Sequence, residues 1–262
     1  EKPDWYDALN GLPGLMGSSL SETLELKRLV KYLLIHLDEN VSANLPIEVA
    51  NFLEKLAVVL NINSQNHDHL RYWDDSYKIK EDFRRVTVFG LSGEEKRIDA
   101  TTLQTFLQQL EAKCSEAVNQ CRQRYGNYYT YFINDLVEFD HASNHSLKAK
   151  RFEQKPLPLF LEGFVHALRV EKDLEIAKLV KNSPLYDKKL KMFRVNASLA
   201  ETTIEIGRAK VFTPGWLENE SIWLHMEYKY LLELLKAGLY KEFFDTAKQT
   251  MIPFLNPAVY KR

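Results

Sequence analysis

Residues 19–38 read SLSETLELKRLVKYLLIHLD, and this stretch indicates the kind of fold that the chain adopts. Ser19 and Glu22 form a capping box, in which each side chain bonds the backbone amide of the other residue at the start of a helix. Apolar residues then recur near the helical repeat, so we predict an amphipathic helix that ends near Asp38. These residues are Leu20, Leu24, Val30, Leu33, Leu34 and Leu37.

Similar patterns predict helices along most of the chain. Pro46 stands at a first-turn position, and apolar residues follow it to Leu60. Thr101 and Gln104 form another capping box at the start of a long amphipathic stretch that runs to Cys121. Further helices are predicted at about 67–85, 159–170, 174–180, 220–236 and 239–251, with a break at glycine 238.

Strand signals are few. Residues 128–139 are aromatic and β-branched, and residues 194–198 and 205–212 are weaker candidates for extended structure. Because helices joined by moderate loops dominate the pattern, we predict an all-α array of helical hairpins with minor β segments. In such an array, chemistry is expected in the loops between the helices.

The composition excludes several classes of protein. Lys and Arg total 35 and Asp and Glu total 36, for a net charge of -1, whereas a dedicated nucleic-acid binder usually carries a basic excess. No apolar run approaches the roughly 18 residues of a membrane helix, and the first residues lack the features of a signal peptide. Cys114 and Cys121 are expected to be reduced packing residues. We therefore expect a cytoplasmic protein without a nucleic-acid or membrane partner.

Sequence motifs of several common chemistries are absent. There is no G-x-S-x-G nucleophile elbow and no Walker loop. Residues 11–17, GLPGLMG, lack the dinucleotide-binding spacing, and we interpret them as a loop that allows close backbone approach. His67-x-His69 and His141-x3-His145 have no third ligand at an obvious spacing, so we expect no metal and no cofactor.

Residues 4–11, DWYDALNG, place two carboxylates beside two aromatic rings. The faces of Trp5 and Tyr6 suit the apolar faces of sugar rings, while Asp4 and Asp7 suit hydroxyl groups and proton transfer. The alternative is a loop at a helix start with capping acids.

Residues 213–227, TPGWLENESIWLHME, again combine tryptophans and carboxylates, now with a histidine. If a helix begins near Glu220, its N-terminal amides favour an anion nearby, and His225 lies about one turn inside. The alternative places Trp216 and Trp223 in the core and His225 on a helix face.

These two segments resemble, in the same order, two segments of the cellobiose and chitobiose phosphorylases, glycoside hydrolase family 94. Residues 4–10 are similar to the family segment D-W-N-D-x-L-N, and residues 214–225 to P-G-W-K-E-N-G-G-I-F-x-H. Residues 160–163, FLEG, and 216–223 also resemble an uncharacterised bacterial branch related to these enzymes. Between these segments, the chain resembles the family only in being predicted to form mostly helices.

The resemblance implies an (α/α)6 barrel catalytic domain. Residues 1–262 would form its C-terminal part, with 86–146 as a possible elaboration. Family members cleave a β-glucosidic bond with inorganic phosphate and invert the anomeric carbon. By position, Asp7 corresponds to the general acid and His225 to a histidine that helps to bind phosphate. The implied substrate-binding residues are Asp4, Trp5, Trp216, Glu218 and Glu220.

The residue types are consistent with this chemistry. Asp7, protonated in a dry pocket, would donate a proton to the leaving glycosidic oxygen. Phosphate is already nucleophilic, so one essential carboxylate suffices where an inverting hydrolase needs two. The chain departs from the family at Tyr6, which replaces asparagine, and at Glu220-Ser221, which replace two glycines. The charge of Glu220 disfavours phosphate unless it is paired.

Three functions follow as hypotheses. The first is a phosphorylase whose partners are an oligosaccharide and inorganic phosphate. The second is an inverting hydrolase with Glu218, Glu220 or Glu227 as its base, and the third is a non-catalytic helical module that binds sugar or protein. Other family contacts to sugar and phosphate lie outside the two segments, so we expect the rest of a longer polypeptide or a homodimer partner to supply them.

Overall fold

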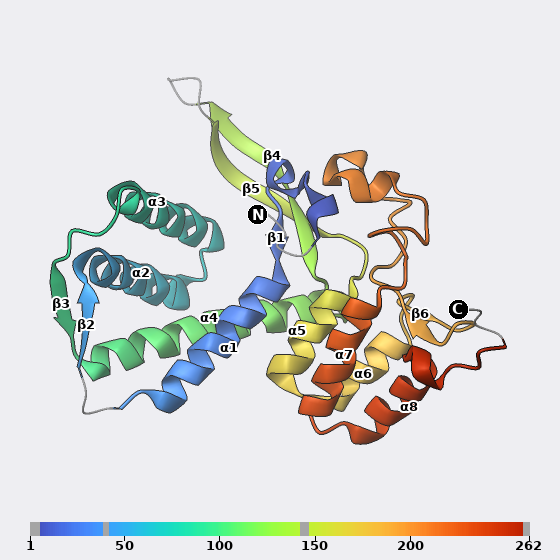
Figure 1. Cartoon of the computed structure of the whole chain (residues 1–262). Helices are drawn as coiled ribbons and strands as arrows, with labels where there is room; N and C mark the ends of the chain where they lie inside the picture. Colours follow the sequence, from blue (N-terminus) through green and yellow to red (C-terminus); the bar gives the residue numbers. More distant parts are fainter. Residues whose placement is uncertain (1–5, 39–41, 142–146, 259–262) are drawn as a thin grey trace. The chain divides into compact units, whose positions relative to one another are not determined.

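The structure, a computed structural model, describes residues 6–38, 42–141 and 147–258 (Figure 1). The chain divides into two compact units, of which the first comprises residues 1–25 and 118–262 and the second residues 26–117. Helices α1 (Leu20–His36) and α4 (Ala100–Tyr125) contribute residues to both units. The segment 86–146, a possible elaboration from the sequence, is thus shared between the units.

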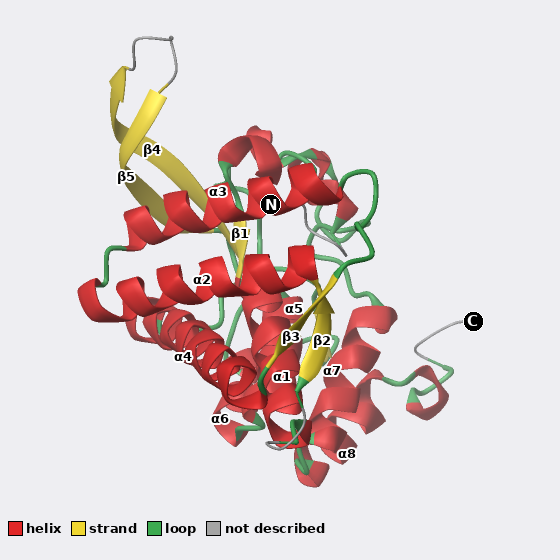
Figure 2. Cartoon of the chain, turned by 90° about the vertical axis from the view of Figure 1, so that its left-hand side faces the viewer, coloured by secondary structure: helices red, strands yellow, loops and turns green. Residues whose placement is uncertain are grey.

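A pair of helices dominates the second unit. Its own elements are β2 (Ala43–Pro46), α2 (Ile47–Asn66), α3 (His69–Thr87) and β3 (Glu95–Ile98). Helices α2 and α3 lie side by side, with the ring centroids of Phe52 and Phe83 5.0 Å apart (Figure 2). The carboxylate of Asp68 accepts a hydrogen bond from the Arg71 amide at 3.0 Å, so Asp68 caps α3 and separates it from α2.

The first unit contains the larger core and both motif segments. Its helices are α5 (Leu161–Glu171), α6 (Leu174–Lys181), α7 (Leu224–Lys236) and α8 (Tyr240–Thr250). Its strands are β1 (Ser18–Ser19), β4 (Tyr131–His141), β5 (Leu147–Pro156), β6 (Tyr186–Asp187) and β7 (Met192–Phe193). Its 3-10 turns are η1 (Asp7–Leu9), η2 (Leu12–Leu15), η3 (Ile204–Ile206), η4 (Arg208–Val211) and η5 (Ile252–Phe254). Helix α5 packs against α7, and buried residues such as Phe164, Leu168 and Leu234 form the core around them.

The predicted all-α fold class, an (α/α)6 barrel, is wrong. The described residues combine helices with small antiparallel sheets, so the fold is mixed α/β. Strand β4 lies between β1 and β5, and the β4–β5 register runs from Phe132 opposite Pro156 to His141 opposite Leu147. The sequence signalled part of β4, but β5 is mostly exposed and basic, so it has too few apolar residues to show a strand pattern.

Smaller predictions are also corrected. Residues 205–212, predicted as a strand, lie mostly in the 3-10 turns η3 and η4. Residues 194–198 form no strand beyond a single bridge between Phe160 and Asn196. The helix predicted from Glu220 begins at Leu224, since residues 213–223 adopt an irregular turn.

Two further observations concern the helices. Cys114 and Cys121 are both buried in α4, and neither forms a disulfide. Within the described part of the chain, every helix is too short or too polar to cross a membrane.

Candidate active site

The first motif is anchored by its tyrosine. Tyr6 is fully buried, and its hydroxyl donates a hydrogen bond to the Val195 carbonyl at 2.9 Å. Its ring meets Phe160 edge-on at 4.9 Å and Tyr131 at 6.1 Å. Asp7 opens the turn η1, and its side chain is exposed. The motif therefore sends Tyr6 into the core and leaves the proposed acid accessible, whereas we expected a dry pocket for Asp7.

The glycine-rich loop after this motif docks on the segment that precedes the second motif (Figure 1). The Gly11 amide donates to the Ile206 carbonyl at 3.1 Å, and the Arg208 amide donates to Asn10 Oδ1 at 3.3 Å. A Cβ atom on Gly11 would lie 1.7 Å from the Glu205 carbonyl oxygen. Only glycine therefore fits at this close backbone approach.

Replacing Gly11 with alanine should lower the free energy of unfolding by about 2 kcal/mol, because the added methyl group forces two backbone segments apart. Urea unfolding followed by circular dichroism measures the change. Gly14→Ala is the matched control, since Gly14 lies in the same loop and a Cβ atom there meets nothing within 4 Å. Equal stabilities of the two variants would contradict the docking.

The second motif forms an irregular, partly strained turn. Leu217 and Glu220 have positive φ angles of 47° and 53°, a region that costs non-glycine residues energy and that is often found at functional sites. The Asn219 amide group donates to the Phe212 carbonyl at 2.7 Å and holds the turn closed. Trp216 remains 59% exposed, with its ring edge-on to Phe212 at 5.7 Å. Trp216 is thus an accessible aromatic surface and not a core residue.

The two motifs are bonded to the same residue, since the Tyr6 hydroxyl donates to the Val195 carbonyl and the Val195 amide donates to the Ser221 carbonyl, each at 2.9 Å. Burial raises the pKa of the Tyr6 hydroxyl well above its ordinary value, and the carboxylates of Glu162 and Glu218 raise it further. Glu218 is half-buried. The structure thus links Tyr6, beside Asp7, through Val195 to Ser221 of the second motif, whereas Asp4 and Trp5 lie outside the described residues.

Glu220 is paired with an arginine that the sequence analysis missed. Its carboxylate lies 2.9 Å from Arg194 Nη1, and Arg194 Nη2 lies 2.9 Å from Asp187. The Glu220 amide also donates to Asn196 Oδ1 at 2.7 Å. Glu220 stands where the family segment has glycine, and its negative charge is therefore neutralised by Arg194.

His225 is the second residue of α7, not one turn inside the helix, and its side chain is exposed. The first amides of a helix have no intrahelical acceptor, and the helix dipole favours anions at this end. The position therefore suits phosphate.

Glu162 is a second residue that the sequence analysis missed as part of the site. It lies in the first turn of α5 and is 8% exposed. Tyr131 donates its hydroxyl to Glu162 Oε2 at 2.6 Å, and His166 Nε2 lies 3.8 Å from Oε1. The FLEG segment, residues 160–163, was noted in the sequence. The hydrogen bond between Glu162 and a tyrosine 31 residues away, however, leaves no local sequence pattern.

An ion-pair network continues from His166 into the core. His166 Nδ1 lies 2.7 Å from Glu25, and Arg169 lies 2.5 Å from the same Glu25 oxygen. Burial opposes the charge of Glu25, but the hydrogen bonds from His166 and Arg169 outweigh it and lower the pKa of Glu25. Arg169 also holds Glu233, which is 1% exposed, at 2.9 Å. The network fixes α5 against α1 and α7 behind the candidate site.

The described residues contain no group of three or more His, Cys, Asp or Glu side chains that could hold a metal ion. His67 and His69 each lie within 4 Å of the Glu116 carboxylate instead.

Comparison of the sequence with protein-family models and with curated proteins found no match. The resemblance to glycoside hydrolase family 94 therefore depends on the two motif segments of the sequence alone.

Proposed function

We propose that the protein is a carbohydrate-active enzyme that cleaves a β-glucosidic bond by inverting phosphorolysis. The observation that supports the proposal is that both motif segments are hydrogen-bonded to Val195, through Tyr6 and Ser221, within one compact unit. A chance match of two short motifs gives no reason for them to lie together. Residues that share a site must do so, whatever the fold class that supports them.

Asp7 acts as the general acid in this proposal. Asp7 is exposed without substrate, and in this proposal the bound sugar excludes water from it, so that Asp7 holds a proton and donates it to the glycosidic oxygen as the bond to the anomeric carbon breaks. Phosphate forms the new bond to that carbon from the opposite face, and the product is an α-sugar 1-phosphate. Trp5 and Asp4 hold the sugar whose bond is cleaved, while Trp216 and Glu218 contact the leaving sugar.

Phosphate binds at the start of α7. His225, when protonated, and the first amides of the helix stabilise the negative charge. Arg194 supports this arrangement, because its pairing with Glu220 removes the repulsion that an unpaired carboxylate would exert on the anion. No further cofactor is required, and we place the enzyme in the cytoplasm.

The geometry weakens two of the three carboxylates that an inverting hydrolase could use as its base. A hydrolase needs a carboxylate base that can activate water, and Glu218, Glu220 and Glu227 are the candidates. Glu220 is held in an ion pair with Arg194, and Glu227 is 0% exposed. Only Glu218 remains available, whereas phosphate attack needs no protein base.

The test is a phosphate-dependence assay. The protein is incubated with a panel of β-linked gluco-oligosaccharides, with inorganic phosphate or with sulfate at the same ionic strength, and products are followed by 31P and 1H NMR. We expect α-sugar 1-phosphate with phosphate only. Free sugar at equal rates under both conditions would support the hydrolase instead. Binding without turnover, by folded protein, would support the non-catalytic module.

A further inference from the structure

A loop in the second unit presents several apolar side chains to solvent. It joins α3 to β3 and spans residues 88–94 (Figure 1). Phe89 is fully exposed, and three apolar residues around it are each more than half exposed, namely Val86, Val88 and Leu91. Contiguous exposed apolar side chains are uncommon on monomeric proteins and mark interaction sites.

Hydrogen bonds hold this loop in place. The Gly90 amide donates to the Thr87 carbonyl at 3.0 Å, within the turn that carries Phe89. The Ser92 amide donates to Glu48 Oε1 on α2 at 2.8 Å. Because the turn is already formed, covering Phe89 with a partner costs little backbone entropy.

A groove of about 240 Å³ begins beside the loop, between α2 and α3. Its apolar lining consists of Phe52, Ile79, Phe83 and Val86. Val86 leads into the loop, and Glu48, which also lines the groove, accepts the hydrogen bond from the loop. A cavity of roughly 150 Å³ is large enough for a benzene ring, so the groove can take a phenylalanine side chain.

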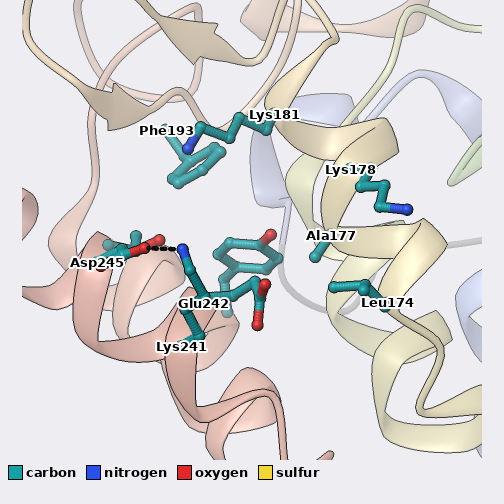
Figure 3. Close-up of a pocket in the computed structure, with 10 residues that line it drawn as sticks. Leu174, Ala177, Lys178, Lys181, Phe193, Lys241, Glu242 and Asp245 are labelled. Carbon is teal, nitrogen blue, oxygen red and sulfur yellow. Dashed lines mark hydrogen bonds and ion pairs between the residues drawn. The ribbon is translucent and has the colours of Figure 1, made fainter.

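The pocket drawn in Figure 3 is a different kind of surface. It lies in the first unit, between α6, α7 and α8, and its rim is charged. Lys241 lies 2.6 Å from Asp245, and Lys178 lies 2.5 Å from Glu175. These charges are satisfied within the protein, whereas the loop and the groove of the second unit leave apolar side chains in water.

We propose that this face of the second unit binds a second copy of the chain, with Phe89 of each copy seated in the α2–α3 groove of the other. A two-fold pair can form because the projecting side chain and the groove that receives it lie on the same surface. The charges that line the groove are balanced between two acids and two bases, Glu48, Asp82, Lys55 and Arg85. An identical face therefore meets no net repulsion, whereas a highly charged partner or an anionic membrane finds no net attraction.

The area of this face is sufficient for a stable pair. Covering the four exposed apolar side chains and the groove walls on both copies removes on the order of 1,500 Å² from water, which is within the range of specific dimers. The inference does not depend on the proposed function, since these residues lie outside the two motif segments.

The test is sedimentation equilibrium of the whole chain at micromolar concentrations, where we expect a dimer. Phe89→Ser removes the projecting ring, and Asn51→Trp fills the groove. Each variant should weaken dimerisation about thirtyfold or more, as substitutions of central interface residues do. Both positions are exposed, so both variants should fold normally. Ile35→Ser, at an exposed apolar position on α1 in the same unit, is the control and should dimerise as the wild type does.

A mixture of the two variants tests the arrangement itself. A mixed pair keeps one contact, in which Phe89 of the Asn51→Trp copy enters the groove of the Phe89→Ser copy, whereas a pair of either variant alone keeps none. If the two contacts contribute equally, the mixed pair should be about fivefold tighter than a pair of either variant. Sedimentation velocity with one variant fluorescently labelled measures this difference.

A monomer at all accessible concentrations would overturn the proposal, as would a dimer that Phe89→Ser leaves intact. Equal association in the mixture and in the separate variants would show that Phe89 does not occupy the groove. Binding to phosphatidylserine vesicles that Phe89→Ser abolishes, without a dimer, would assign the loop to a membrane surface instead. None of these results affects the phosphate-dependence assay, so each proposal can fail alone.

Discussion

Replacing Asp7 with asparagine should lower kcat for an oligosaccharide substrate by about a thousandfold, which lies within the usual contribution of general acid catalysis. Asparagine keeps the size of the side chain but has no proton to give to the leaving oxygen. KM should change little, because the exposed Asp7 acts on the transition state more than on the bound substrate. Initial rates of sugar 1-phosphate release measure both constants.

A substrate with an activated leaving group tests the role of Asp7 directly. The dinitrophenolate of a dinitrophenyl β-glucoside departs without being protonated. The loss of kcat caused by Asp7→Asn should therefore shrink to less than about tenfold with this substrate. Glu205→Gln is the matched control, since Glu205 is another exposed acid in the segment that contacts the first motif, and its turnover should be normal. An equal loss with both substrates would show that Asp7 does not act as the acid.

The sequence predicted local structure better than it predicted the fold. The apolar spacing in residues 20–37 and the long amphipathic stretch before Cys121 correspond to α1 and α4, because periodicity reports directly on a helix face. The hairpin of β4 and β5 was missed as a unit, since its exposed β5 strand has no apolar pattern and pairing depends on a distant partner. That hairpin is one reason why the fold is not an all-α barrel.

The candidate site, like the fold, could be predicted from the sequence only in part. Aromatic and acidic residue types identified the segments around Asp7 and Glu218, because their unusual local composition is visible in the chain itself. Arg194 and Tyr131 could not be found in this way. Arg194 acts by pairing with Glu220, 26 positions away, and Tyr131 by donating to Glu162, 31 positions away. Only the folded chain shows which carboxylates are neutralised and which remain available.

A substitution at Glu227 should have the second large effect, on the free energy of unfolding. It is 0% exposed, and burial raises its pKa to about 7 even though the Phe193 amide donates to Oε1 at 2.9 Å and opposes the shift. Its Oε2 atom has no hydrogen-bond partner within the described part of the chain. The group is therefore best accommodated as the neutral acid.

The raised pKa fixes the sign of the pH dependence. In the unfolded chain Glu227 loses its proton near pH 4.5, but in the folded protein it keeps the proton up to about pH 7. Below pH 4.5 both states are protonated, and the group has no effect on stability through its charge. As the pH rises from 4.5 to about 7, ionisation stabilises the unfolded state alone, so stability is lost.

Glu227→Gln removes this titration and keeps an oxygen that can accept from the Phe193 amide. The stability of the variant relative to the wild type should therefore rise by about 2.5 kcal/mol between about pH 5 and pH 8, as measured by urea unfolding at each pH. Glu153→Gln, at an exposed position on β5, should show far less change with pH. A constant difference for Glu227→Gln would contradict a buried neutral carboxyl. Since a carboxyl that cannot reach solvent cannot activate water, full turnover by Glu227→Gln would also exclude this residue as a hydrolytic base.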